Sequence, residues 1–175
     1  MMNLRDEILK EHSKRQAHKI AAWVGSDEDR FEELLDFVLK DEPIVSQRAA
    51  YAFGVVADLQ PQLMQKHLEV LIETLKQPKL HDAVKRNIVR MLQEVHIPDD
   101  LLGTVTDVCF GYLASGVEPI AIKAFSMTVL LKVARRYPDI KNELKMLIEH
   151  QLIDASPATL NRGQKVLKEL ERLGD

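Results

Sequence analysis

Six histidines and one cysteine are the side chains of this 175-residue chain best suited to bind a metal or act as nucleophiles. No two histidines stand four residues apart, and none lies in a His-Glu-x-x-His pattern. The single cysteine, Cys109, excludes an internal disulfide, and its neighbours Val108 and Phe110 predict a buried thiol. The chain also has neither a glycine-rich phosphate loop nor a nucleophile elbow. We therefore expect no metal, no cofactor and no catalytic site.

Charged residues offer another kind of chemistry, the recognition of an oppositely charged partner. The formal net charge is only −3, but two sets of segments alternate along the chain with opposite charge. The A segments hold 8 basic and 19 acidic residues and comprise 3–11, 27–42, 63–76, 98–115 and 139–152. The B segments hold 16 basic and 6 acidic residues and comprise 13–24, 44–58, 79–97, 117–136 and 155–173. This distribution indicates one positive and one negative face.

The elements that must position these charges are predicted to be helices. The seven prolines are spaced 17 to 21 residues apart, and each interval fits one helix and one turn because proline begins helices and interrupts their interiors. Apolar residues recur at helical spacing in most segments. We expect nine or ten antiparallel helices and no sheet, with 62–76 as one helix and a possible break in 3–24 near Ser13. Gly54, Gly103 and Gly111 are predicted to allow close helix crossings.

The stretch 41–58 gives the clearest repeat. Its pattern Val-x-x-x-Ala-Ala-x-Ala-Phe-Gly, from Val45 to Gly54, has weaker copies that begin at Val84, Ile122 and Thr159. The copies are 39, 38 and 37 residues apart, within the range of helical repeats. The pattern resembles the second helix of a HEAT repeat. This resemblance implies an all-α superhelix of about five antiparallel helix pairs in a single domain over 1–175, with repeats at 3–24, 27–58, 62–96, 98–136 and 139–173.

The resemblance also implies that the B helices line the concave face, which would then be positive. Aligning the copies predicts two exposed rows on these helices, Lys19, Tyr51, Arg90, Thr128 and Lys165 in one and Gln16, Arg48, Asn87, Phe125 and Arg162 in the other. We call the predicted binding residues the basic ridge, and they are Arg48, Tyr51, Arg86, Arg90, Arg162 and Lys165, with Trp23 beside them. Arginine and tyrosine are common binding hot spots. The competing interpretation is that these cations only solvate a face and pair with acids of the A helices.

Two functions are compatible with this pattern. The first is a non-enzymatic scaffold that binds an acidic segment of a partner protein. The second is a nucleic-acid-binding protein, in the extreme a DNA-alkylation glycosylase of the HEAT-like kind, for which Trp23, Asp58 and Arg90 are the nearest candidates. The sequence contains no apolar run long enough to span a membrane, and its charged N-terminus does not resemble a signal peptide. We expect a cytoplasmic protein and leave its oligomeric state open.

Overall fold

The fold is built from helices alone. The structure is a computed structural model that describes residues 2–40, 42–153 and 155–173, and within these ranges no strand occurs. The prediction of an all-α fold made of stacked helix pairs is therefore confirmed. The chain divides into two compact units, Met1–His96 and Ile97–Asp175, and this boundary falls between the predicted repeats 62–96 and 98–136. A single domain over 1–175 stays a prediction.

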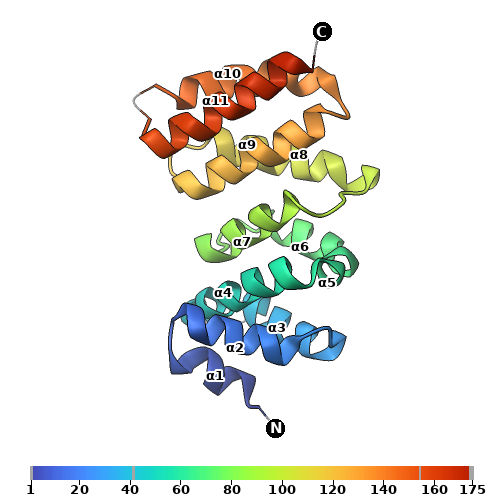
Figure 1. Ribbon diagram of the computed structural model, residues 1–175, viewed down its shortest axis with the longest axis vertical. Helices are drawn as coiled ribbons and strands as arrows, with labels where there is room; N and C mark the ends of the chain where they lie inside the picture. Colours follow the sequence, from blue (N-terminus) through green and yellow to red (C-terminus); the bar gives the residue numbers. More distant parts are fainter. Residues whose placement is uncertain (1, 41, 154, 174–175) are drawn as a thin grey trace. The chain divides into compact units, whose positions relative to one another are not determined.

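The first unit holds three helix pairs, coloured from blue to green in Figure 1. Each pair has an A helix followed by a B helix, and the A helix of the third pair is in two parts. The B helices α2, α4 and α7 pack against one another in succession. The elements are α1 (Leu4–Lys10), α2 (Lys14–Val24), α3 (Glu28–Lys40), α4 (Pro43–Leu59), α5 (Pro61–Lys66), α6 (Leu68–Thr74) and α7 (Asp82–Leu92).

The second unit holds two further pairs, coloured from yellow to red in Figure 1. In it α8 packs on α9, α10 packs on α11, and the B helices α9 and α11 contact each other. A short 3-10 helix, η1, joins α9 to α10. The elements are α8 (Asp99–Ala114), α9 (Ile120–Ala134), η1 (Pro138–Ile140), α10 (Lys141–Gln151) and α11 (Pro157–Arg172).

Local sequence signals set the ends of these helices. Ser13 caps α2 by accepting a hydrogen bond from the Gln16 N–H at 3.1 Å, and Ser156 caps α11 in the same way. Proline opens α4, α5 and α11, where its missing N–H removes no helical bond. Gly25, at φ 53°, follows α2 in a conformation that favours glycine.

Apolar residues at the predicted helical spacing form the core. In the first unit, Phe31 of α3 and Phe53 of α4 are fully buried, with ring centroids 6.2 Å apart. In the second unit, Ile122 and Leu130 of α9 and Ile148 of α10 are equally buried. The apolar residues that recur at helical spacing thus supply the core of each unit.

Two predictions about the helices were wrong in detail, namely the single helix over 62–76 and the number of helices. The segment 62–76 is two helices, because the backbone at His67 (φ −104°, ψ 11°) leaves helical geometry and ends α5 before α6 begins. The segment 3–24 is also divided, near Ser13, as the sequence allowed. The described residues consequently form eleven α-helices, where nine or ten were expected.

Of the three glycines predicted to allow close helix crossings, only Gly54 does so. At Gly54 an added Cβ would lie 2.3 Å from Asn87 Oδ1, so this glycine does permit a close approach of α4 and α7. At Gly103 and Gly111 an added Cβ would meet nothing within 4 Å. The prediction that these two glycines allow close helix crossing was wrong, because both lie on the exposed side of α8.

Candidate binding surface on the B helices

The basic ridge of the first unit begins on α4. Arg48 is half-buried, and its Nη1 donates a hydrogen bond to the carbonyl oxygen of Leu9 at 2.6 Å. Tyr51, one turn further along the same helix, is half-buried beside His12, with ring centroids 5.6 Å apart. Both side chains thus contact the preceding repeat while part of each stays accessible to solvent.

Two ridge arginines lie on α7 and differ in their surroundings. Arg90 donates from Nη2 to the carbonyl oxygen of Gly54 at 2.7 Å and from Nη1 to Oδ2 of Asp58 at 3.0 Å. Its side chain is 33% exposed. Arg86 is exposed, and no hydrogen bond or ion pair of its side chain is found in the described part of the chain. Arg86 is therefore available to a partner, whereas Arg90 is largely committed to α4.

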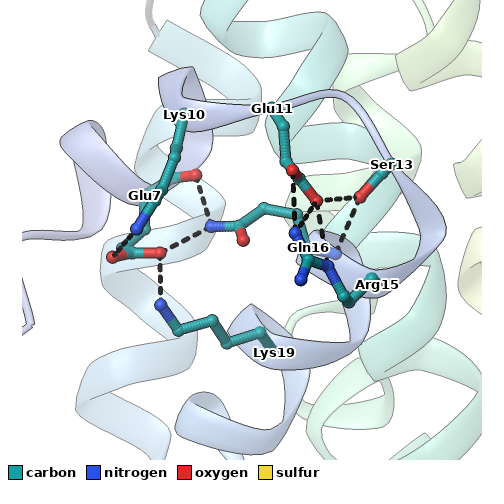
Figure 2. Close-up of polar contacts among 7 residues, drawn as sticks. All are labelled: Glu7, Lys10, Glu11, Ser13, Arg15, Gln16 and Lys19. Atoms are coloured by element: carbon teal, nitrogen blue, oxygen red, sulfur yellow. Dashed lines mark hydrogen bonds and ion pairs between the residues drawn. The ribbon is translucent and has the colours of Figure 1, made fainter.

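Basic residues of the first repeat are neutralised locally, as Figure 2 shows. Glu7 of α1 accepts hydrogen bonds from Lys19 Nζ at 2.7 Å and from Gln16 Nε2 at 2.6 Å. These two bonds hold the pKa of Glu7 below its ordinary value. Glu11 accepts from Ser13 and from Arg15, and its pKa is lowered for the same reason. Arg15 and Lys19 of the first repeat are therefore already paired within the chain.

Two positions predicted to be exposed are buried. Gln16 is 5% exposed because its amide also donates to the carbonyl oxygen of Glu7 at 2.7 Å. Asn87 is 6% exposed because it fits into the space that Gly54 leaves open on α4. Both side chains point toward a neighbouring helix. A repeat alignment cannot tell such a position from one that points into solvent.

In the second unit the ridge consists of two residues of α11. Arg162 is half-buried and donates from Nη1 to Oγ1 of Thr128 on α9 at 2.8 Å. Lys165 is exposed, with no hydrogen bond or ion pair of its ammonium group among the described residues. As in the first unit, one cation contacts the adjacent B helix and another is open to solvent.

Trp23 is half-buried and already contacts a cation of its own chain. The guanidinium of Arg30 lies 5.1 Å from its ring centroid and also donates to its carbonyl oxygen at 2.7 Å. Of the three residues considered for the nucleic-acid alternative, the structure brings Asp58 and Arg90 together as an ion pair. These two also line a cleft of about 420 Å³ between the end of α4 and α7.

A relationship that the sequence prediction missed links these arginines. Arg48 and Leu9 are 39 residues apart, Arg90 and Gly54 are 36 apart, and Arg136 donates to the carbonyl oxygen of Ile97 across 39. Each separation is close to one repeat. Arg48 and Arg90 thus connect their repeats to the preceding ones by binding backbone carbonyl groups, whereas Arg136 ties the end of α9 to the residue just before α8 of the same pair. The repeat length was visible in the sequence and could have suggested such contacts.

The described ranges hold no group of three or more histidine, cysteine or acidic side chains that could bind a metal ion. Among the described helices, none is both long and apolar enough to cross a bilayer.

Comparison with known proteins agrees with this architecture. The family model described as HEAT repeat domain matches residues 4–170, which is nearly the whole chain. No curated protein and no solved structure matches it. HEAT repeats in general form solenoids that mediate protein interactions. With its stacked pairs of A and B helices and this match, the chain belongs to the HEAT repeat domain family.

Proposed function

We propose that this HEAT repeat protein is a non-enzymatic interaction module whose basic ridge binds an acidic segment of a partner protein. The observation that carries the proposal is the exposure of Arg86 and Lys165 on B helices, each without a hydrogen bond or ion pair among the described residues. An exposed cation of this kind can pair with a carboxylate without first breaking a contact within the protein.

The half-buried ridge residues support the same function in a different way. Arg48 uses Nη1 to bind Leu9, and a guanidinium group has five N–H donors, so donors remain for a carboxylate. Tyr51 lies on the same helix and combines an apolar ring with a polar hydroxyl group. Arginine and tyrosine positioned in this way are the usual anchors of an interface.

Charge attraction would mainly speed association with the partner and select acidic partners. The contacts of the half-buried Arg48 and Tyr51 would set the lifetime of the complex. Repeat proteins in general present such surfaces on successive repeats, which suits an extended ligand. A phosphate backbone would satisfy the same cations, and nucleic acid is therefore the alternative ligand.

The test uses a fluorescently labelled peptide rich in aspartate and glutamate and a labelled DNA duplex, each titrated with the protein in fluorescence anisotropy. The variant Arg86→Glu/Lys165→Glu reverses the two open ridge cations. The control Lys76→Glu/Lys145→Glu makes the same change of charge at two exposed lysines of the A segments, one in each unit.

We expect the ridge variant to weaken peptide binding by about tenfold or more, since it loses two charged contacts, and the control to change it much less. Equal weakening by both variants, or no binding of the peptide by the wild type, would overturn the proposal. Tighter binding of DNA, with a steep loss of affinity as salt rises, would support the nucleic-acid alternative.

A further inference from the structure

The second unit has a cleft that contains no residue of the basic ridge. It lies between one face of α8 and the segment that joins α9 to α10, and its volume is about 350 Å³. This volume is within the range of small-ligand pockets, and it can hold one long side chain. The lining residues are Asp99, Leu102, Gly103, Thr106, Asp107, Val133, Tyr137 and Ile140.

The apolar part of the lining could hold a chain of methylene groups. Leu102 and Val133 are buried at 6% and 3% exposure, and Ile140 is half-buried. Tyr137 is exposed, at 44% of its surface. An aromatic face beside aliphatic side chains favours an apolar group that ends in a cation.

The polar side chains that α8 contributes to the cleft can only accept hydrogen bonds. Asp99 and Asp107 carry carboxylates, and Thr106 donates its hydroxyl hydrogen to the carbonyl oxygen of Leu102 at 2.7 Å. The Thr106 oxygen therefore keeps only its acceptor capacity. A ligand that satisfies these groups must donate hydrogen bonds, and a positive charge would suit the two carboxylates.

The chain itself holds a cation in the same surroundings. Arg136 lies with its guanidinium carbon 5.8 Å from the ring centroid of Tyr137, and it forms an ion pair with Asp99. Asp99 is thereby partly neutralised. Asp107, two turns further along α8, is exposed, and its carboxylate has no ion pair or hydrogen bond in the part of the chain that the structure describes.

Gly103 lies in the interior of α8, where a glycine weakens the helix. Helix packing does not require a glycine here, because an added Cβ would meet nothing within 4 Å. Its effect is to leave bare backbone along the cleft between Asp99 and Asp107. A larger side chain at this position would occupy the space that a ligand needs.

We propose that this cleft binds a lysine side chain from a basic segment of a partner protein. The methylene groups of the lysine lie along Gly103 and the apolar lining, and its ammonium group pairs with Asp107. The site is independent of the basic ridge, whose ligand would carry the opposite charge.

The test follows the amide signals of α8 by NMR while the full chain is titrated with a capped Ala-Lys-Ala peptide. The same peptide with norleucine in place of lysine keeps the methylene groups and removes the charge. Gly103→Leu fills the cleft, and Gly111→Leu makes the same change at another exposed glycine of α8 that does not line it. Asp107→Asn removes the carboxylate charge, and Asp100→Asn is its control on an exposed aspartate outside the lining.

We expect saturable shifts around Gly103 and Asp107 with the lysine peptide and none with the norleucine peptide. Gly103→Leu should abolish the shifts and Gly111→Leu should leave them, while both variants remain folded because leucine favours a helix more than glycine does. Asp107→Asn should weaken binding by about tenfold and Asp100→Asn much less. The proposal is overturned if the norleucine peptide binds equally well, if the lysine peptide does not bind, or if each variant behaves like its control.

Discussion

Arg90 and Gly54 are joined by a hydrogen bond of 2.7 Å, from Nη2 of the arginine on α7 to the carbonyl oxygen of the glycine on α4. The same glycine leaves the space that Asn87 Oδ1 occupies, 2.3 Å from where a Cβ would be. Gly54 thus contributes to the contact between α4 and α7 in two ways, because its carbonyl oxygen accepts a hydrogen bond and its missing side chain leaves room for Asn87. The contact explains why a glycine stands in the interior of α4.

Gly54→Ala should destabilise the protein although alanine is the better helix former. The new Cβ would meet Asn87 Oδ1 at 2.3 Å and Arg90 Nη2 at 3.1 Å, so α4 and α7 must shift or Asn87 must rotate. Overpacking of this kind costs about 1–3 kcal/mol of unfolding free energy, measurable by urea denaturation. As a control, Gly111→Ala has open space and should gain up to about 1 kcal/mol. Equal effects of the two substitutions would contradict this account of the contact between α4 and α7.

Arg90→Ala should cost more stability than Arg86→Ala. Arg90 loses its hydrogen bonds to Gly54 and Asp58, and the partly buried bond to the carbonyl contributes about 0.5–1.5 kcal/mol. Arg86 is exposed, and its replacement should stay within about 0.5 kcal/mol of wild type. Chemical denaturation of both variants measures the two losses of unfolding free energy. A larger loss for Arg86→Ala would show that Arg86, and not Arg90, stabilises the contact between repeats.

Phe53→Ala should lower the unfolding free energy by about 3–5 kcal/mol, because it leaves a cavity in the core of the first unit. Phe53 is fully buried beside Phe31. Tyr51→Ala, two residues earlier on the half-buried side of α4, is the matched control and should cost clearly less. A thermal midpoint of Phe53→Ala equal to that of wild type would show that the inward face of α4 has been assigned wrongly.

Glu7→Gln should make stability less dependent on pH. Hydrogen bonds from Lys19 first and Gln16 second hold the pKa of Glu7 below its ordinary value, so its ionised form stabilises the folded state at neutral pH. That contribution is lost as the pH falls through the folded pKa. The variant should therefore be less stable than wild type at neutral pH, and the difference should shrink to nothing in strong acid.

Urea midpoints across the acid range test this prediction. Glu33→Gln provides the control, because Glu33 is exposed and its carboxylate accepts no hydrogen bond within the described ranges. A constant difference between Glu7→Gln and wild type at every pH would show that the Glu7 carboxylate is not linked to folding through its charge.

Cys109 should resist alkylation until the protein unfolds. Burial raises the pKa of its thiol to about 12, and the hydrogen bond with Ser126 opposes this only in part. Since the thiolate is the reactive form, iodoacetamide at mildly alkaline pH should modify the native protein very slowly and the urea-unfolded protein rapidly. Mass spectrometry measures the modified fraction, and rapid labelling under native conditions would mean that α8 and α9 open readily.

The sequence alone determined the helices and their alternation in charge. Proline, serine caps and the apolar period act within one helix or one turn, so Pro43, Ser13 and the buried face around Phe53 could be placed without knowledge of the neighbours. The HEAT pattern added the pairing of helices, because it is repeated along the chain at nearly constant spacing.

Tertiary structure decided which polar residues remain available to a partner. Gln16 and Asn87 occupy the same repeat position as the half-buried Arg48 and Arg162, but they are buried because another helix covers them. Arg48 and Arg90 bind carbonyl groups 39 and 36 residues away, and the cleft at Gly103 needs α8 beside Tyr137, 34 positions later. A repeat alignment gives the direction of a side chain on its own helix, whereas burial and hydrogen bonding depend on atoms that other repeats bring to it.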